Sequence, residues 1–268
     1  MKKLFVLALI AVVAGGISSC SKSSTGDTSL EKVMKEGKFV LGLDESFPPM
    51  GFRDPDTNEI VGYDIDLAKE VCKRLGVEFL AQPINWNAKE QELRTGKIDC
   101  IWNGFTITEE RKKEILYSPP YLANAQVVIV NENSPVKTLA DLAGKTVDTQ
   151  KGSSSVDAID AMPDFKASLK SVIELDNFLT AFMDLESGRA DAVVADLVVG
   201  NYDINKTGKK FVKLEETLGT EQFGIGFRKN DKALEEKVWS ILLEMESEGV
   251  IAEISKKWFN EDISVVGK

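Results

Sequence analysis

The feature that most constrains the fold is a regular alternation of short apolar segments with amphipathic helical patterns. The segments typical of strands, in chain order, are KFVLGL, VEFLA, IDCIW, AQVVIV, KTVDT, SVIEL and ADAVVA. Helical patterns cover Asp64–Arg74, Ala88–Thr95 and Asn177–Ser187. This order predicts an α/β fold, in which sheets rich in parallel strands carry helices on both faces.

An internal repeat divides the chain into two similar parts. LRTGKIDCIWNG (93–104) and LESGRADAVVAD (185–196) share a helix end, a glycine, a basic residue, an aspartate and a short apolar strand. Gly96 and Gly188 stand where a left-handed helix C-cap is needed. Helix–glycine–strand junctions are common, so chance similarity is the alternative. We expect two similar α/β lobes, each with an equivalent strand ending near residue 103 or 195.

The ends of these strands predict where a ligand binds. In open α/β sheets, ligands bind beyond the carboxyl ends of the strands. If the two lobes face each other, Asn103, Gly104 and Thr106 of one repeat lie opposite Asp196 of the other. Hydrogen-bond donors on one side of a cleft would then face a carboxylate on the other side.

Such a cleft suits a zwitterion, which carries a carboxylate and an ammonium group. Arg111 can hold a carboxylate through two parallel hydrogen bonds, which lysine cannot do. The stretch QKGSSS (150–155) follows a strand and precedes a helix, so its amides can complete an anion site. Asp196 can pair with an ammonium group, assisted by the Gly104 carbonyl and the Thr106 hydroxyl. We also expect the Thr-x-x-Arg pattern of TEER (108–111) to open a helix at this site.

The N-terminus has the layout of an export signal. Lys2 and Lys3 precede an apolar run from Leu4 to Ala14, which is too short for a comfortable membrane span. ISSC, ending at Cys20, resembles a bacterial lipobox, in which the cysteine is lipidated. Secretion with an incidental cysteine is the alternative. We expect a signal peptide (1–19), a lipid anchor at Cys20 followed by a flexible tether (20–29), and an extracytoplasmic, membrane-anchored location.

Composition excludes several other functions. The net charge of −10 argues against binding nucleic acid, which requires a basic surface. The chain has no histidine, so a histidine-ligated metal and a Ser-His-Asp triad are ruled out. We expect no metal and no cofactor. Cys72 and Cys100 are expected to be free thiols in the core, with a disulfide as the alternative.

Several separated motifs, taken together, resemble one family. GLDESFPPMGF, IVGYDIDLAKEV, IDCIWNGFTITEER, YSPPYL, DLAGKTVDTQKGSSS and SGRADAVVAD occur in the family's order between about Phe39 and Trp258. They are similar to the polar amino-acid-binding proteins of ABC importers, the bacterial extracellular solute-binding proteins of family 3. The resemblance implies a two-lobed periplasmic-binding-protein ("Venus flytrap") fold, with two α/β sandwich lobes joined by a two-segment hinge. It also implies a monomer that delivers an L-amino acid to a membrane permease.

The resemblance also implies roles for individual residues. Arg111, with the amides of Thr106 and Ser154, would hold the ligand carboxylate, and Asp196, Thr106 and the Gly104 carbonyl would hold the ammonium group. The ligand side chain would lie between Phe47 and Trp86, with Asp44 at its polar end. Gln150 would border the same pocket, beside Asn103. Some basic-amino-acid binders pair a cysteine at the position of Cys72 with one seven residues later, where this chain has Phe79.

Each of these residues also has a purely structural interpretation. Arg111 could be a solvated charge on a helix, and Asp196 an N-cap of the following helix. Phe47 and Trp86 could be ordinary core aromatics. Residues 153–155 could be a flexible loop. Their joint occurrence in the family's order favours the functional interpretation.

The expected lobes are 30–122 plus 223–268 for the first and 123–222 for the second.

Asp44 favours a basic amino acid (arginine or lysine) first and glutamine second, and it disfavours glutamate and aspartate. An amino-acid sensor domain and a dehydratase on the same fold are the alternatives. The dehydratase would need a general acid in the cleft, yet Asp44 and Asp196 are already explained by binding.

Overall fold

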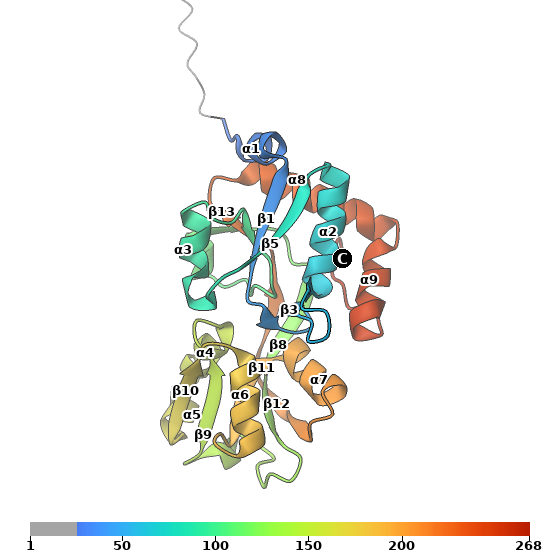
Figure 1. Ribbon diagram of the computed structural model, residues 1–268. Helices are drawn as coiled ribbons and strands as arrows, with labels where there is room; N and C mark the ends of the chain where they lie inside the picture. Colours follow the sequence, from blue (N-terminus) through green and yellow to red (C-terminus); the bar gives the residue numbers. More distant parts are fainter. Residues whose placement is uncertain (1–25) are drawn as a thin grey trace, which may run out of the picture.

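The computed structural model of the 268-residue chain describes residues 26–268. The expected signal peptide, Cys20 and the first part of the tether lie outside these residues. The described chain forms two α/β lobes, one above the other (Figure 1). None of the helices between residues 26 and 268 has the length and apolar character needed to cross a membrane.

The first lobe is built on a five-stranded sheet of order β5-β1-β6-β13-β7. Its strands are β1 (Lys38–Leu43), β5 (Glu78–Pro83), β6 (Cys100–Ile101), β7 (Ile115–Tyr117) and β13 (Gly226–Arg228). β1 is parallel to β5 and β6, whereas β13 is antiparallel to β6 and β7. Its helices are α1 (Ser29–Glu36), α2 (Tyr63–Leu75), α3 (Lys89–Arg94), α8 (Lys232–Ser247) and α9 (Val250–Phe259).

The side chains of β1 alternate between the two faces of this sheet. Phe39, Leu41 and Leu43 pack in the cluster that includes α2, while Val40 packs with Leu93 of α3. Helices on both faces therefore bury the sheet, as the alternation of strands and helices predicts. α2 ends at Gly76, which has the left-handed φ of 74° that a C-cap requires.

The second lobe repeats this arrangement. Its sheet has the order β10-β9-β11-β8-β12. The first three strands are parallel to one another, β8 is antiparallel to β11, and β12 is antiparallel to β8. The strands are β8 (Leu122–Asn131), β9 (Thr146–Gln150), β10 (Ser171–Leu175), β11 (Ala192–Asp196) and β12 (Phe211–Phe223). The helices are α4 (Ser154–Asp160), α5 (Pro163–Ser168), α6 (Phe178–Ser187) and α7 (Leu197–Lys206).

The internal repeat corresponds to this shared topology. β6 and β11, the strands of the two copies, both occupy the third position in their sheets. Gly96 and Gly188, which precede them, have φ of 78° and 75°. The prediction of two similar lobes is therefore confirmed, and the repeat is more than a chance similarity.

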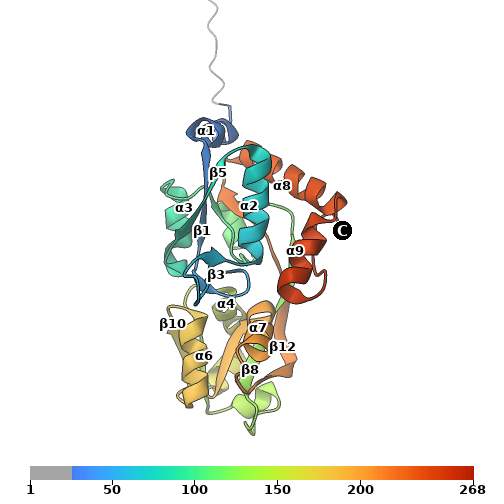
Figure 2. The same ribbon diagram turned by 45° about the vertical axis from the view of Figure 1, so that its right-hand side comes forward.

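Two neighbouring strands connect the lobes. β8 and β12 pair antiparallel along their length, and the pairing includes Leu122 with Phe223. Both strands extend between the lower lobe and the upper one, in opposite chain directions (Figures 1 and 2). Near the same point Thr106 forms a bridge with Phe223, and Leu122 forms one with Ser264. The chain thus passes between the lobes through adjacent segments.

Smaller elements complete the structure. A three-stranded antiparallel sheet lies beside the first lobe and consists of β2 (Ser46–Phe47), β3 (Gly51–Arg53) and β4 (Ile60–Val61). Three 3-10 turns are η1 (Trp86–Ala88), η2 (Arg111–Lys113) and η3 (Leu139–Leu142). The expectation that Thr-x-x-Arg opens a helix is wrong in extent, because only the single turn η2 forms. The Thr108 hydroxyl accepts the Arg111 N–H at 3.1 Å, and β7 begins soon after.

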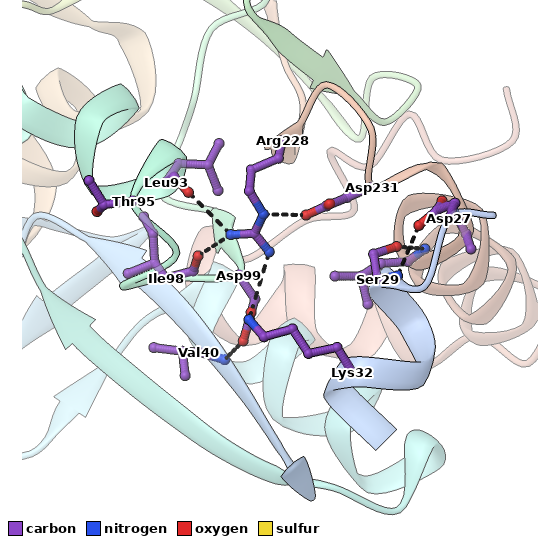
Figure 3. A network of polar contacts seen from close by, with 12 residues as sticks. Asp27, Ser29, Lys32, Val40, Leu93, Thr95, Ile98, Asp99, Arg228 and Asp231 are labelled. Carbon is purple, nitrogen blue, oxygen red and sulfur yellow. Dashed lines mark hydrogen bonds and ion pairs between the residues drawn. The ribbon is translucent and has the colours of Figure 1, made fainter. Parts of the chain in front are cut away.

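Residues 27–29, which we expected in the tether, contact the start of α8. The carboxylate of Asp27 accepts the N–H of Ala233, and the Ser29 hydroxyl accepts the N–H of Leu234 at 3.1 Å. Beside them, Arg228 binds Asp231 and the carbonyls of Leu93 and Ile98 (Figure 3). This network joins the chain's first described residues to the first lobe.

Cys72 and Cys100, the cysteines within residues 26–268, are free and buried, as expected. Burial raises the pKa of the Cys72 thiol to about 12. A thiol of this kind is packed as a small apolar group and is unreactive at neutral pH.

Candidate functional site

The carboxyl ends of strands from both lobes meet between them. Asp44 follows β1, residues 102–106 follow β6, Gln150 ends β9 and Asp196 ends β11. These segments lie beside one another, because the Gln150 amide bonds to Asp44 and the Thr106 hydroxyl bonds to Ser154. The predicted residues are therefore brought together, and side chains of one lobe bond to the other throughout this region.

Arg111 reaches across the boundary between the lobes. Its guanidinium donates to the Thr106 carbonyl of the first lobe at 3.0 Å and to the Gly152 carbonyl of the second at 3.2 Å. The guanidinium carbon lies 4.9 Å from the centre of the Phe105 ring, a cation–π distance. Arg111 is thus a positioned group rather than a freely solvated charge.

Thr106 and Ser154 form a second contact between the lobes. Their hydroxyl oxygens lie 2.9 Å apart, and both bond to the same oxygen of Glu221, at 2.9 and 3.2 Å. Thr106 is 3% exposed and Ser154 6% exposed, so these hydroxyls are shielded from water. Ser154 is the first residue of α4, where a backbone N–H has no carbonyl within the helix to bind.

Asp196, the last residue of β11, lies in the same region. Its carboxylate accepts the side-chain amides of Asn124 at 2.6 Å and Gln126 at 2.9 Å. It stands at the N-cap position of α7 but makes no capping hydrogen bond. The structural interpretation of Asp196 as a cap does not account for its side chain, which points to the amides of β8 instead.

Asp44 and Gln150, which we expect near the polar end of the ligand side chain, form a hydrogen bond with each other. The amide of Gln150 donates to the Asp44 carboxylate at 2.6 Å, and this bond joins β1 of one lobe to β9 of the other. Burial raises the pKa of Asp44, and the hydrogen bonds from Ser46 and Gln150 oppose the shift. Asn103 accepts the Asp44 N–H at 3.0 Å, while its own buried amide nitrogen has no partner among the described residues.

Gly104 permits a close approach of the backbone to an aromatic ring. It has a φ of 59°, and a Cβ at this position would lie 2.7 Å from Phe47. Its N–H donates to the buried carboxylate of Asp64 at 2.8 Å, which fixes the loop after β6. Phe47 in turn contacts Phe178 of α6, with ring centres 5.8 Å apart. The contact between Phe47 and Phe178 therefore also joins the two lobes.

Trp86 packs edge-on against Phe105, with ring centres 5.8 Å apart. Lys89, which is 2% exposed, lies 5.0 Å from the Trp86 ring and donates to the Gly152 carbonyl at 2.9 Å. Burial, together with the charge of Arg111, lowers the pKa of Lys89 to about 8. Phe47 and Trp86 are buried core aromatics that also border the polar region.

Sequence reasoning missed Lys89, Glu221, Asn124 and Gln126. Lys89 carried a signal, because it lies four residues before Leu93 on the buried face of its helix. The other three lie on β8 and β12, and their proximity arises only from the pairing of those strands. No local pattern marks them.

Two matching α/β lobes with buried polar side chains at their facing strand ends define the class of two-lobed binding proteins. The family model for bacterial extracellular solute-binding proteins, family 3, matches residues 39–261. The chain belongs to this family. The family is extracellular, which agrees with the extracytoplasmic location expected from the sequence.

Similar proteins are known in sequence and structure. The chain is 36% identical to the ABC transporter glutamine-binding protein GlnH of Bacillus subtilis, over 98% of this chain and 99% of the relative. The structure of Tv2483 bound to L-arginine matches with a TM-score of 0.86 and 34% identity, covering 91% of this chain and 99% of that one. A substrate-binding protein of an ABC uptake transporter from Streptococcus pneumoniae, with bound histidine, matches with a TM-score of 0.86 and 35% identity. That match covers 90% of this chain and all of the other.

Proposed function

We propose that the protein binds a polar L-amino acid between its lobes and delivers it to the permease of an ABC importer. The observation that carries this proposal is the convergence of Arg111, Thr106 and Ser154 with Asp196 from facing strand ends. A zwitterion requires donors for its carboxylate and an acceptor for its ammonium, and this region offers both. The relatives bind glutamine, arginine and histidine, which are polar amino acids.

The ligand carboxylate binds Arg111, assisted by the amides of Thr106 and Ser154. Two parallel hydrogen bonds from a guanidinium fix both the position and the orientation of a carboxylate. Arg111 now donates to carbonyls of both lobes, so its side chain already lies at the boundary that closure buries. The ammonium group binds Asp196, with the Gly104 carbonyl and the Thr106 hydroxyl beside it.

The ligand side chain lies between Phe47 and Trp86 and ends near Asp44 and Gln150. A guanidinium or a flat amide can stack on these rings, and a cation there gains cation–π attraction. The Asp44 carboxylate accepts from a cation or an amide and repels a second carboxylate. The order of preference is therefore basic amino acids, then glutamine, then glutamate and aspartate last.

The lobes move relative to each other about the paired segments near Leu122 and Phe223. The proposed first lobe comprises residues 30–122 and 223–268, and the second comprises 123–222. Closure removes charge-assisted bonds from water and so strengthens them. The bonds from Arg111 and Gln150 that join the lobes support this arrangement, because each forms only when the lobes are together.

The remaining parts of the proposal concern location and assembly. A lipid on Cys20 anchors a monomeric protein to the outer face of the cell membrane, or to the periplasmic side, with residues 21–26 as a tether. No chemical step is assigned to the cleft: its acids Asp44 and Asp196 are bonded to amides that position them for binding. An amino-acid sensor domain is the alternative function.

Calorimetric titration against a panel of L-amino acids tests the function. The protein is unfolded and refolded first, so that no ligand is carried over from expression. We expect saturable binding confined to arginine, lysine or glutamine, with a dissociation constant on the order of 1 μM, which is about −8 kcal/mol. A folded protein that binds no amino acid of the panel would contradict the proposal.

A further inference from the structure

Asp196 does not lie alone in the cleft, because Glu221 of β12 reaches the same point. One oxygen of Glu221 accepts the amide of Asn124 at 2.6 Å and the amide of Gln126 at 2.8 Å. These are the same two amide nitrogens that donate to Asp196. Two carboxyl groups are therefore held against each other by a shared pair of amides.

This pair of carboxyl groups has no cation to balance it. Neither Asp196 nor Glu221 forms an ion pair with a lysine or arginine of residues 26–268. Asp196 is 3% exposed and Glu221 is half-buried, and two carboxylates that share the same amide donors cannot both ionise without a cost. A shared proton is the usual solution for such a pair.

An unpartnered acceptor lies at the same place. The side-chain oxygen of Asn124 is buried and has no hydrogen-bond partner among the described residues, although its nitrogen serves both carboxyl groups. Buried acceptors are nearly always bonded, so this one indicates a missing donor. An ammonium group carries three N–H donors, which matches Asp196, Glu221 and the Asn124 oxygen.

We infer that Asp196 and Glu221 share one proton in the free protein and that the ammonium group of the ligand displaces it. The O–H bond of the carboxylic acid breaks, the proton leaves to solvent, and the ammonium pairs with the two carboxylates that remain. This inference rests on the proposed function, because the ammonium belongs to the amino acid. It adds Glu221 as a ligand-contacting residue and makes ligand capture release a proton.

The charges around the pair of carboxyl groups favour binding of an ammonium group. Burial, followed by the charge of Glu221, raises the pKa of Asp196 well above its usual value. Asp157 of α4 lies near Glu221 and adds negative charge, while the cations Arg111 and Lys89 lie near Asp157 and partly offset it. The hydroxyls of Thr106 and Ser154 and the amides of β8 that contact the pair are neutral. A cation is therefore favoured there, and it favours the ionised form of both acids.

Proton release can be counted by calorimetry. L-arginine is titrated into the full chain in two buffers of different ionisation enthalpy, at several pH values between about 5 and 8, and the difference in heat gives the protons released. We expect release that reaches about one proton per ligand in this range. Binding without proton release at every pH would overturn the inference and leave the proposed function standing.

Glu221→Gln tests the residue itself and keeps the size of the side chain. We expect it to abolish most of the release and to weaken arginine binding about tenfold, because one charge-assisted bond is lost. Glu215→Gln, at an exposed position of the same strand, should change neither quantity. Unchanged release in a folded Glu221→Gln would overturn the pairing. If that variant does not fold, the proton count of the unaltered protein still decides. Failure of every amino acid to bind would remove the proposed function, and this inference with it.

Discussion

At the scale of single residues, Arg111 carries the largest share of ligand recognition. Removal of one partner of a buried, charge-assisted contact costs about 2–5 kcal/mol. Arg111→Ala should therefore weaken amino-acid binding by at least about 30-fold, as measured by calorimetry. Lys112→Ala is the matched control, because Lys112 is exposed and its ion pair, within residues 26–268, is with Glu109 at the surface. Equal affinities for the two variants would contradict the role given to Arg111.

Asp44 sets the preference among ligands. The Asp44 carboxylate carries a negative charge that attracts a cationic ligand. Its hydrogen bond with Gln150 can also form with a neutral acceptor. Asp44→Asn should lower the affinity for arginine and lysine about tenfold or more relative to glutamine, since a charge-assisted bond becomes a neutral one. Glu45→Gln changes the neighbouring charge, which pairs with Arg53 at the surface, and should leave the ratio unchanged. An unchanged ratio in Asp44→Asn would show that Asp44 does not meet the ligand side chain.

At the scale of elements, the start of α8 depends on the chain's first described residues. Asp231, its N-cap residue, makes no side-chain capping bond, and Asp27 and Ser29 supply acceptors instead. Ser29→Ala should lower the free energy of unfolding by about 1 kcal/mol, the usual cost of a lost cap. Denaturant unfolding measures this change, with Thr28→Ala as the control, because Thr28 is exposed and makes no capping bond. A loss in the control as large as that in Ser29→Ala would contradict the capping role.

Elements defined by local patterns could be predicted from the sequence. The strand at 171–175 and the helix ending at Ser187 followed from periodicity and a glycine C-cap, and both are present. The repeat predicted equivalent strands, which β6 and β11 are. The short η2 could not be predicted, because the start of β7 limits it and that strand exists only through pairing with β13.

The site was predictable only in part, for the same physical reason. Asp44, Thr106, Ser154 and Asp196 lie at strand ends or helix starts, which local patterns locate. Glu221 and Gln126 lie within paired strands of the second lobe, and their contacts join positions about a hundred residues apart. Pairing register determines such contacts, and a single sequence does not reveal register.

At the scale of the whole molecule, buried carboxyl groups should determine how stability varies with pH. Asp64 is fully buried, and burial raises its pKa to about 7, although Gly104 and Tyr121 donate hydrogen bonds to it. An unfolded Asp64 loses its proton near pH 4. The folded protein therefore binds more protons between about pH 4 and 7, and the free energy of unfolding falls as pH rises through that range.

Asp64→Asn tests this dependence and keeps an acceptor for Gly104 and Tyr121. Thermal or denaturant unfolding at about pH 4.5 and 7 should show a smaller fall in stability for the variant than for the original chain. Asp148 and Asp203, whose pKa values burial raises to about 6, should preserve part of the slope. A variant with the same pH profile as the original chain would show that Asp64 does not titrate in this range.

The two lobes are proposed to hold an amino acid by both of its charged ends. The most direct measurement is a crystal structure with the amino acid that binds most tightly in the titrations. We expect the carboxylate on the Arg111 guanidinium, the ammonium between Asp196 and Glu221, and the side chain directed to Asp44. A ligand bound with its ends reversed, or bound outside the boundary between the lobes, would contradict it.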